Sequence, residues 1–172
     1  IKATERQDLA AWAEARPGYV EYLDVVRAIA IGEVTDCPLY FVHIHNPESL
    51  GPIAEAQMEG RIVLAETCPQ YLVLNSDSDI PGRLGKINPP LRDAQSNEGL
   101  WEGLNQGLIS CVGSDHCSTK KEMAPDLWNA PPGSPGVENL LPVMLSEGVN
   151  KGRISMEKLV EVLCANNAKA FG

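Results

Sequence analysis

The chain lacks an excess of basic residues, a long apolar run and a recognisable secretion signal. Its 172 residues contain 14 Lys and Arg against 23 Asp and Glu, a net charge of -9 at pH 7. This balance leaves no basic surface for the phosphates of a nucleic acid or for an anionic membrane. No apolar run approaches the roughly 20 residues that cross a bilayer, and residues 1–6 lack a basic segment followed by an apolar one. We therefore expect a small-molecule ligand and neither a nucleic-acid nor a membrane partner.

The chain lacks any regular spacing of cysteines. The cysteines are odd in number and none forms a Cys-x-x-Cys motif with another: Cys37, Cys68, Cys111, Cys117 and Cys164. This pattern argues against a disulfide framework and against a zinc site built from thiolates. We expect reduced thiols and a cytoplasmic protein. With 44% hydrophobic and 22% charged residues, the composition is that of an ordinary globular domain.

Apolar runs of strand length alternate with stretches of helical spacing. The apolar runs cover residues 39–44, 61–66 and 108–113. The helical stretches cover residues 19–32, 47–57, 97–106, 137–147 and 155–166. The apolar runs have almost no polar alternation, which is typical of strands buried on both faces of a parallel sheet. An α/β fold follows, and three strands are too few for a closed barrel of eight. We predict a partial TIM-type (β/α)8 barrel.

A long polar segment separates the second and third apolar runs. Residues 69–92 include Asn-Ser-Asp-Ser-Asp at positions 75–79 and Pro-Pro at positions 89–90. Segments of this length in compact domains often serve as lids or binding loops, so we predict a functional loop. Arg92 at its end could bind a carboxylate or make a structural contact, and we favour the structural role. Further along, Ser155 is a predicted helix N-cap.

Two side chains with catalytic chemistry follow predicted strands. His43 comes near the end of the first apolar run, and Asp115 follows the third. In parallel α/β folds the carboxyl ends of the strands meet at one face, where catalytic groups gather. An imidazole and a carboxylate there are suitable ligands for a divalent ion such as zinc, which would acidify water for hydrolysis. The alternative is a hydrogen-bonded core histidine and a helix-capping aspartate.

Other polar residues nearby carry weaker signals. His45 would share a strand face with His43, but the apolar run ends before it, so we do not favour a His-x-His metal pair. His116 either supports a neighbouring ligand or has a structural role, with neither option preferred. Cys68 and Cys117 lack an identifiable base, so we favour packing roles over nucleophilic ones.

Residues 66–72, Glu-Thr-Cys-Pro-Gln-Tyr-Leu, closely resemble the dihydropyrimidinase and D-hydantoinase branch of the amidohydrolase superfamily. The resemblance begins at about Arg16, and further matches keep the order of the family. They are Leu-Tyr-Phe-Val-His at 39–43, Pro-Pro-Leu-Arg at 89–92, Leu-Trp at 100–101, Gly-Ser-Asp-His-Cys at 113–117, Pro-Gly-Val-Glu at 135–138, Gly-Arg-Ile-Ser at 152–155 and Asn-Ala-Lys-Ala-Phe-Gly at 167–172.

The resemblance implies a (β/α)8 barrel that opens a cyclic amide or ureide ring with two divalent metals, usually zinc, bridged by a carboxylated lysine and hydroxide. His43 looks like the metal ligand on the sixth strand. Asp115 looks like the eighth-strand aspartate, which binds metal and shuttles the proton to the leaving nitrogen. Residues 1–172 would then be the C-terminal part of the barrel, roughly strands 6 to 8, from a longer chain that supplies the remaining ligands. We expect such a piece to be inactive alone and the intact protein to be a homotetramer.

The resemblance also places the substrate. Family members hold the ring largely through main-chain groups at positions that correspond to Asn88 and Pro132, where hydantoinases typically carry Ser and Asn. Asn before Pro-Pro-Leu-Arg is similar to dihydroorotases, and allantoinases share the architecture, so the expected substrate class is a cyclic amide or ureide. A non-catalytic alternative is a scaffold resembling the collapsin response mediator proteins. Retention of His43 and Asp115 argues against the scaffold.

Overall fold

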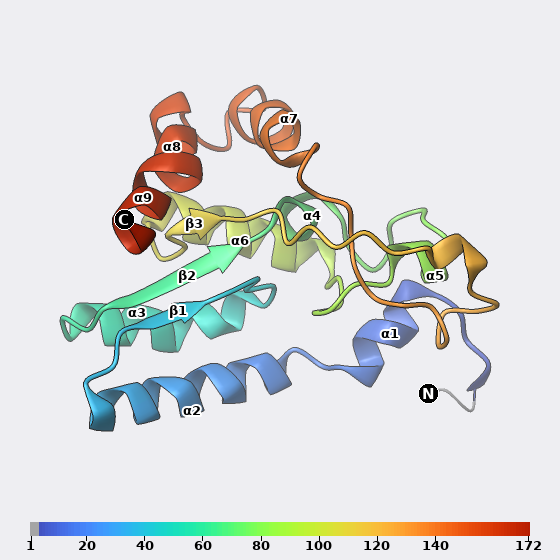
Figure 1. The fold of residues 1–172 in the computed structure, drawn as a ribbon, viewed down its shortest axis with the longest axis horizontal. Coiled ribbons are helices and arrows are strands. Elements are labelled where there is room, and N and C mark those ends of the chain that lie inside the picture. The colour runs from blue at the N-terminus through green and yellow to red at the C-terminus, as the bar shows by residue number, and fades with distance from the viewer. Residues whose placement is uncertain (1–3) are drawn as a thin grey trace.

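A three-stranded parallel sheet forms the centre of the fold. The computed structural model describes residues 4–172 (Figure 1). Strands β1 (Leu39–Phe41), β2 (Val63–Thr67) and β3 (Cys111–Val112) lie in the order β1-β2-β3. Leu39 pairs with Val63 and Glu66 with Cys111, with all strands parallel. The predicted parallel α/β sheet is therefore confirmed.

The first and third strands are shorter than the apolar runs that predicted them. Main-chain pairing still continues past their ends, because the N–H of Ile44 donates to the Glu66 carbonyl oxygen at 2.7 Å and that of Gly113 to Thr67 at 2.9 Å. At His43 the backbone takes a positive φ of 44°, which ends the regular extended conformation. The buried apolar runs thus extend beyond the regular strands.

Nine α-helices accompany this sheet within residues 4–172. They are α1 (Leu9–Ala15), α2 (Tyr19–Thr35), α3 (Leu50–Met58), α4 (Pro69–Val73), α5 (Gly82–Gly85), α6 (Ala94–Gln106), α7 (Leu140–Val143), α8 (Met156–Val160) and α9 (Asn166–Phe171). Short 3₁₀ turns cover Pro47–Ser49 and Lys121–Met123, and π-helical turns cover Met144–Val149 and Glu161–Ala165. None of the helices described is both long and apolar enough to cross a membrane.

The segment at residues 69–92 is more ordered than a loop. It contains α4 and α5, with Pro69 at the first helical position of α4, where its missing N–H costs nothing. Tyr71 and Leu72 of α4 are buried in the core, and the Tyr71 hydroxyl donates to the Pro89 carbonyl oxygen at 2.9 Å. We predicted a loop because the segment is mostly polar, and its few buried apolar residues, Tyr71 and Leu72, were not recognised as part of a helix.

Helices cover one face of the sheet. In Figure 1, α3 and α6 lie behind the strands, and no helix crosses β1 and β2 on the side toward the viewer. Burial along β2 alternates accordingly: Val63, Ala65 and Thr67 are buried, whereas Leu64 and Glu66 are only partly buried. Parallel sheets are normally covered on both faces, and in a closed barrel the second face is the interior. One-sided cover is the property expected of a segment of barrel wall.

The N-terminus of α6 provides a test of local structure. The Asp93 carboxylate accepts the N–H and the hydroxyl of Ser96, each at 2.8 Å, and these bonds lower the pKa of Asp93. We predict that Asp93→Ala lowers the free energy of unfolding by about 1 kcal/mol at neutral pH. Because a depressed pKa stabilises only the ionised folded form, this difference should shrink as the pH falls below the ordinary value of 3.8. Urea unfolding at several pH values measures it, with exposed Asp77→Ala as control; an equal loss in both variants contradicts the prediction.

Candidate active site

Both predicted metal ligands have a strained backbone. His43 follows β1 with φ of 44°, and Asp115 follows β3 with φ of 45°. Positive φ is uncommon outside glycine, although Asp and His tolerate it better than most residues. Such strain gathers at functional sites, where the surrounding structure holds a side chain in a required direction. The same left-handed backbone conformation therefore turns both side chains, an imidazole and a carboxylate, away from the regular strand direction at the ends of β1 and β3.

His43 and Asn88 line one hollow of about 920 Å³. The Nδ1 atom of His43 and the Oδ1 atom of Asn88 are both buried, and neither has a hydrogen-bond partner among the described residues. Buried polar atoms are nearly always paired, so two unpaired atoms in one hollow mark a place for a ligand. The structure thus brings together one predicted metal ligand and one predicted substrate contact.

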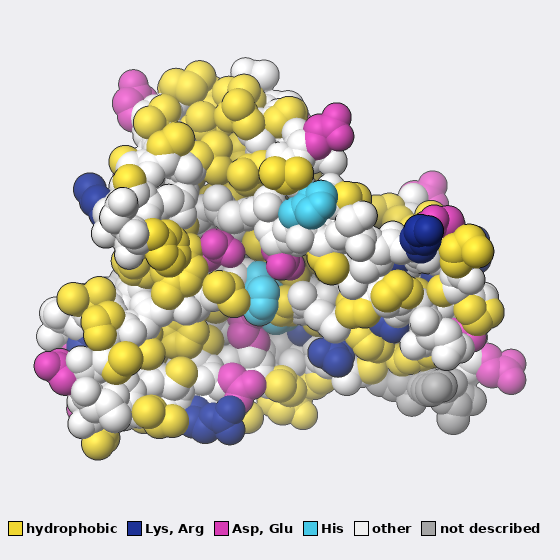
Figure 2. All heavy atoms as spheres, in the orientation of Figure 1, with side chains coloured by type: hydrophobic (Ala, Val, Ile, Leu, Met, Phe, Trp, Pro, Cys, Tyr) yellow, Lys and Arg dark blue, Asp and Glu magenta, His cyan; other side chains and the backbone are white. Residues whose placement is uncertain are grey.

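Asp115 lies outside the lining of this hollow but close to the end of β2. Its side chain is exposed. Burial raises the pKa of Cys68, the residue after β2, and the charges of Glu66 and Asp115 raise it further. Figure 2 shows histidine and acidic side chains gathered near the centre of the molecular face on the uncovered side of the sheet. The Asp115 carboxylate is therefore accessible at the edge where the strands end.

The loop that contains Pro132 runs beside the segment of Asp115. The N–H of Cys117 donates to the Ser134 carbonyl oxygen at 2.8 Å, and a parallel bridge joins His116 to Ser134. Gly136 permits the closest approach, because a Cβ there would lie 2.3 Å from the Ser114 carbonyl oxygen. Pro132 itself is exposed. The loop that carries the second predicted substrate contact thus runs beside the segment of the predicted proton shuttle.

The side chain of His116 forms a hydrogen bond that also joins the Pro132 loop to the segment of Asp115. Its Nδ1 atom accepts the N–H of Val137 at 3.3 Å, which ties the end of the Pro132 loop to the residue after Asp115. The structural alternative for His116 therefore has an observed partner.

His45 is part of a buried polar network that sequence reasoning missed. Its Nδ1 atom bonds the Glu21 carboxylate, and its Nε2 atom lies 2.8 Å from Nη2 of Arg92. Arg92 can only donate, so Nε2 must accept, and the proton of a neutral ring lies on Nδ1. Burial lowers the pKa of His45, and the charge of Arg92 acts in the same direction. Both nitrogens are engaged, so His45 does not pair with His43 as a ligand.

Arg92 has the structural role that was favoured for it. Its Nη1 atom donates to the Ala13 carbonyl oxygen at 3.1 Å and its Nη2 atom to that of Arg16 at 2.5 Å. Glu21 completes the network by accepting the hydroxyl of Ser49 at 2.8 Å and the N–H of Asn46 at 3.2 Å. No short motif marks these contacts, because Glu21 and Arg92 lie far apart in the sequence.

We predicted packing roles for Cys68 and Cys117, and the structure buries the first and exposes the second. Cys68 is fully buried, and burial raises the pKa of its thiol, so it is a poor nucleophile. The exposed Cys117 contacts Gly133, where an added Cβ would lie 2.9 Å from the sulfur. The packing role is confirmed for Cys68.

The residues present fit part of a metal site. No group of three or more His, Cys, Asp or Glu side chains that could hold a metal occurs within residues 4–172. His43 nevertheless has an unpartnered buried nitrogen, and Asp115 an exposed carboxylate, which are the donor types that zinc accepts. The described residues would supply two ligands and leave the rest of the coordination sphere to other groups.

A one-sided parallel sheet with polar side chains at the ends of its strands defines the chain as a segment of a (β/α)8-type barrel. A scan against protein-family models gives no match. The L-hydantoinase of Paenarthrobacter aurescens is 41% identical over 177 residues, covering 100% of this chain and 39% of that protein. The D-hydantoinase of Rhizobium radiobacter is 39% identical over 169 residues, covering 93% of this chain and 37% of that protein.

Solved structures give the same result. The structure titled L-hydantoinase (dihydropyrimidinase) from Arthrobacter aurescens superposes with a TM-score of 0.92 at 41% identity, over 99% of this chain and 39% of that one. The chain belongs to the hydantoinase and dihydropyrimidinase family. It spans only 37–39% of the length of these relatives, in agreement with a partial barrel.

The buried network around Glu21 yields the next prediction. Glu21→Ala should lower the free energy of unfolding by about 3 kcal/mol, because it leaves the buried donors of His45, Asn46 and Ser49 without an acceptor. Glu21→Gln should cost less, since one acceptor oxygen remains. Glu33→Ala is the matched control, because Glu33 lies on the surface and forms an ion pair with Arg61 there. Denaturant unfolding measures all three variants, and similar losses for Glu21→Ala and Glu33→Ala would disprove the role of the network.

Proposed function

We propose that the protein containing this chain hydrolyses the C–N bond of a cyclic amide or ureide ring in a metal-dependent reaction. The observation that carries the proposal is the strained placement of His43 and Asp115 at the carboxyl ends of β1 and β3. The names of relatives agree with this substrate class, since they include hydantoinases and an allantoinase of Escherichia coli, 34% identical over 163 residues.

His43 and Asp115 would hold divalent metal, which we propose to be two zinc ions bridged by a carboxylated lysine outside this chain. When bound, the metal would polarise the ring carbonyl group and make a water molecule more acidic. His43 contributes a nitrogen lone pair from within the hollow, where Nδ1 has no partner in the described structure. Asp115 contributes a carboxylate oxygen from the neighbouring strand end.

Asp115 would also carry the proton. Its carboxylate takes a proton from the attacking water as the oxygen bonds to the ring carbonyl carbon. It then delivers that proton to the ring nitrogen as the C–N bond breaks, so the nitrogen leaves as a neutral amine or amide. The product is one open chain, with the freed nitrogen group at one end and a carboxylic acid at the other, which ionises to a carboxylate at neutral pH. Exposure of Asp115 gives it access to both reacting atoms.

Asn88 and Pro132 would orient the ring. Asn88 lines the hollow with His43 and has an unpartnered oxygen that can accept a ring N–H. Pro132 has no backbone N–H, so its main chain can only accept a hydrogen bond. Both positions therefore suit a substrate rich in N–H donors, which a ureide ring is.

We further propose a cytoplasmic homotetramer. The absence of disulfides among the cysteines supports a reducing compartment. The tetramer is carried over from the family resemblance alone.

Asp115→Asn tests the proton transfer. In the full natural chain that contains these residues, we predict a loss of kcat/KM of at least about 10²-fold on hydantoin and dihydrouracil rings, with little change in stability. Asn tolerates the same left-handed backbone, so folding should survive. Ring opening followed by ultraviolet absorbance measures the loss, and exposed Asp77→Asn is the control. Turnover within a few-fold of wild type would remove Asp115 from this role.

His43→Asn tests metal binding. We predict that the variant retains less zinc per chain than wild type after dialysis, because it lacks the imidazole nitrogen, while His116→Asn retains the wild-type amount. Elemental analysis of the full natural chain gives the metal content. Wild-type protein with neither bound metal nor turnover on any cyclic amide or ureide would overturn the proposed function.

A further inference from the structure

Two lysines are buried beside the candidate site. Lys86 is 4% exposed and Lys121 is 6% exposed, although lysine is among the residues least often buried. Burial lowers the pKa of Lys121 to about 8, and the nearby charge of Lys86 acts in the same direction. Lys121 is therefore still largely protonated at neutral pH. Two cations held close together away from water are costly, so their placement requires an explanation.

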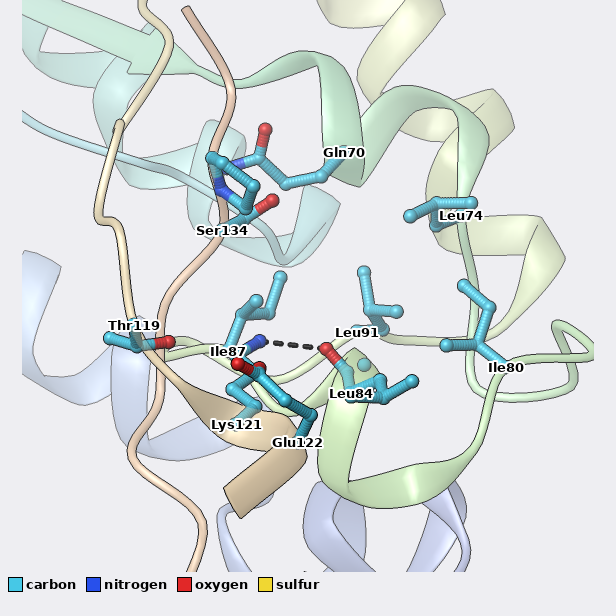
Figure 3. Close-up of a pocket in the computed structure, with 12 residues that line it drawn as sticks. Gln70, Leu74, Ile80, Leu84, Ile87, Leu91, Thr119, Lys121, Glu122 and Ser134 are labelled. Carbon is cyan, nitrogen blue, oxygen red and sulfur yellow. Dashed lines mark hydrogen bonds between the residues drawn. The ribbon is translucent and has the colours of Figure 1, made fainter. Parts of the chain in front are cut away.

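Lys121 joins the segment of Asp115 to the segment of Asn88. It lies in the turn Lys121–Met123, a few residues after Asp115. Its Nζ atom donates to the carbonyl oxygens of Leu84 and Lys86, each at 2.7 Å. Figure 3 shows Lys121 reaching toward Leu84 across the edge of a cavity of about 320 Å³. Lys86 precedes Asn88 by two residues, so the bond anchors the backbone just before that substrate contact.

The loop of Pro132 also forms a hydrogen bond to the carbonyl oxygen of Lys86. The N–H of Gly133, the residue after Pro132, donates to the Lys86 carbonyl oxygen at 3.2 Å. One carbonyl group thus receives the ammonium of Lys121 from one loop and a backbone N–H from another. Asn88 and Pro132 each lie within two residues of this junction.

Lys86 strengthens the junction with its own side chain. Its Nζ atom donates to the carbonyl oxygens of Leu127 at 2.9 Å and Trp128 at 3.1 Å. It also lies 4.3 Å from the centre of the Trp12 ring, in range of a cation–π contact. The two lysines therefore connect the segments around residues 84–88, 115–123 and 127–133.

We propose that Lys121 is a positioning residue that sets the separation of Asn88 and Pro132 by binding the Lys86 carbonyl group on which both loops converge. The inference rests on the proposed function for its effect on substrate. Lys121 touches neither the reacting atoms nor a metal ligand. Its loss should therefore weaken ring binding more than it slows the chemical step.

The test compares Lys121→Met with Lys121→Arg in the full natural chain. Met has similar length but no donor, whereas Arg keeps donors. In Lys121→Met we expect faster amide hydrogen exchange in residues 84–88 and 130–136, with β2 and α6 unchanged. We expect KM for a hydantoin ring to rise about tenfold with kcat within about twofold, and Lys121→Arg to restore part of the loss. Exposed Lys120→Met is the matched control and should behave as wild type.

The outcomes separate this inference from the proposed function. If amide hydrogen exchange in residues 84–88 and 130–136 is unchanged in Lys121→Met, Lys121 does not hold the two loops together, whatever the activity. Faster exchange with unchanged KM overturns the positioning role and leaves a structural one. Wild-type protein that opens no ring refutes the proposed function and with it the effect on substrate, while exchange still decides whether Lys121 holds the loops. If Lys121→Met does not fold, Lys121→Gln takes its place; its amide still donates but reaches less far than the ammonium, so smaller increases in amide exchange and in KM are expected, and no increase in exchange overturns the junction.

Discussion

The buried network of Glu21, His45 and Arg92 is the interaction on which the candidate site depends. Glu21 comes from α2, His45 follows the first strand, and Arg92 ends the Pro-Pro-Leu-Arg segment. Each partner satisfies another: the carboxylate accepts, the neutral imidazole both donates and accepts, and the guanidinium donates. Removing one member would leave buried groups unpaired, so the three elements hold one arrangement. The hollow that contains His43 and Asn88 is lined by this network.

A second constraint is the parallel sheet. Parallel strands place all their carboxyl ends at one edge, which brings residues 43 and 115 to the same side of the molecule although they lie 72 positions apart in the sequence. The strained backbone at both positions then directs the side chains away from the regular strand. Hydrogen bonds outside the strands, from Arg92 to Ala13 and His45 and from Lys121 to Lys86, hold the segment that carries Asn88.

The order of elements could be read from hydropathy because burial imposes a period on the sequence. The runs at residues 39–44 and 61–66 became β1 and β2, and Ser155 caps α8 by accepting the N–H of Lys158 at 3.1 Å, as predicted. Composition was misleading between residues 69 and 92, where polar residues surround buried Tyr71 and Leu72. The lysine junction was also hidden, because a lysine that binds main-chain carbonyl groups leaves no partner side chain to recognise.

The α/β class, the family and the polar residues that follow the strands could all be read from the amino-acid sequence. These properties depend on local periodicity and on short motifs, which are visible along the chain. Tertiary structure alone decided that His45 belongs to Glu21 and Arg92, that His43 and Asn88 share a hollow, and that the loops of Asn88 and Pro132 meet at the Lys86 carbonyl group. The physical reason is that hydrogen bonds and burial act between atoms close in space, and distant pairs leave no periodic trace in sequence.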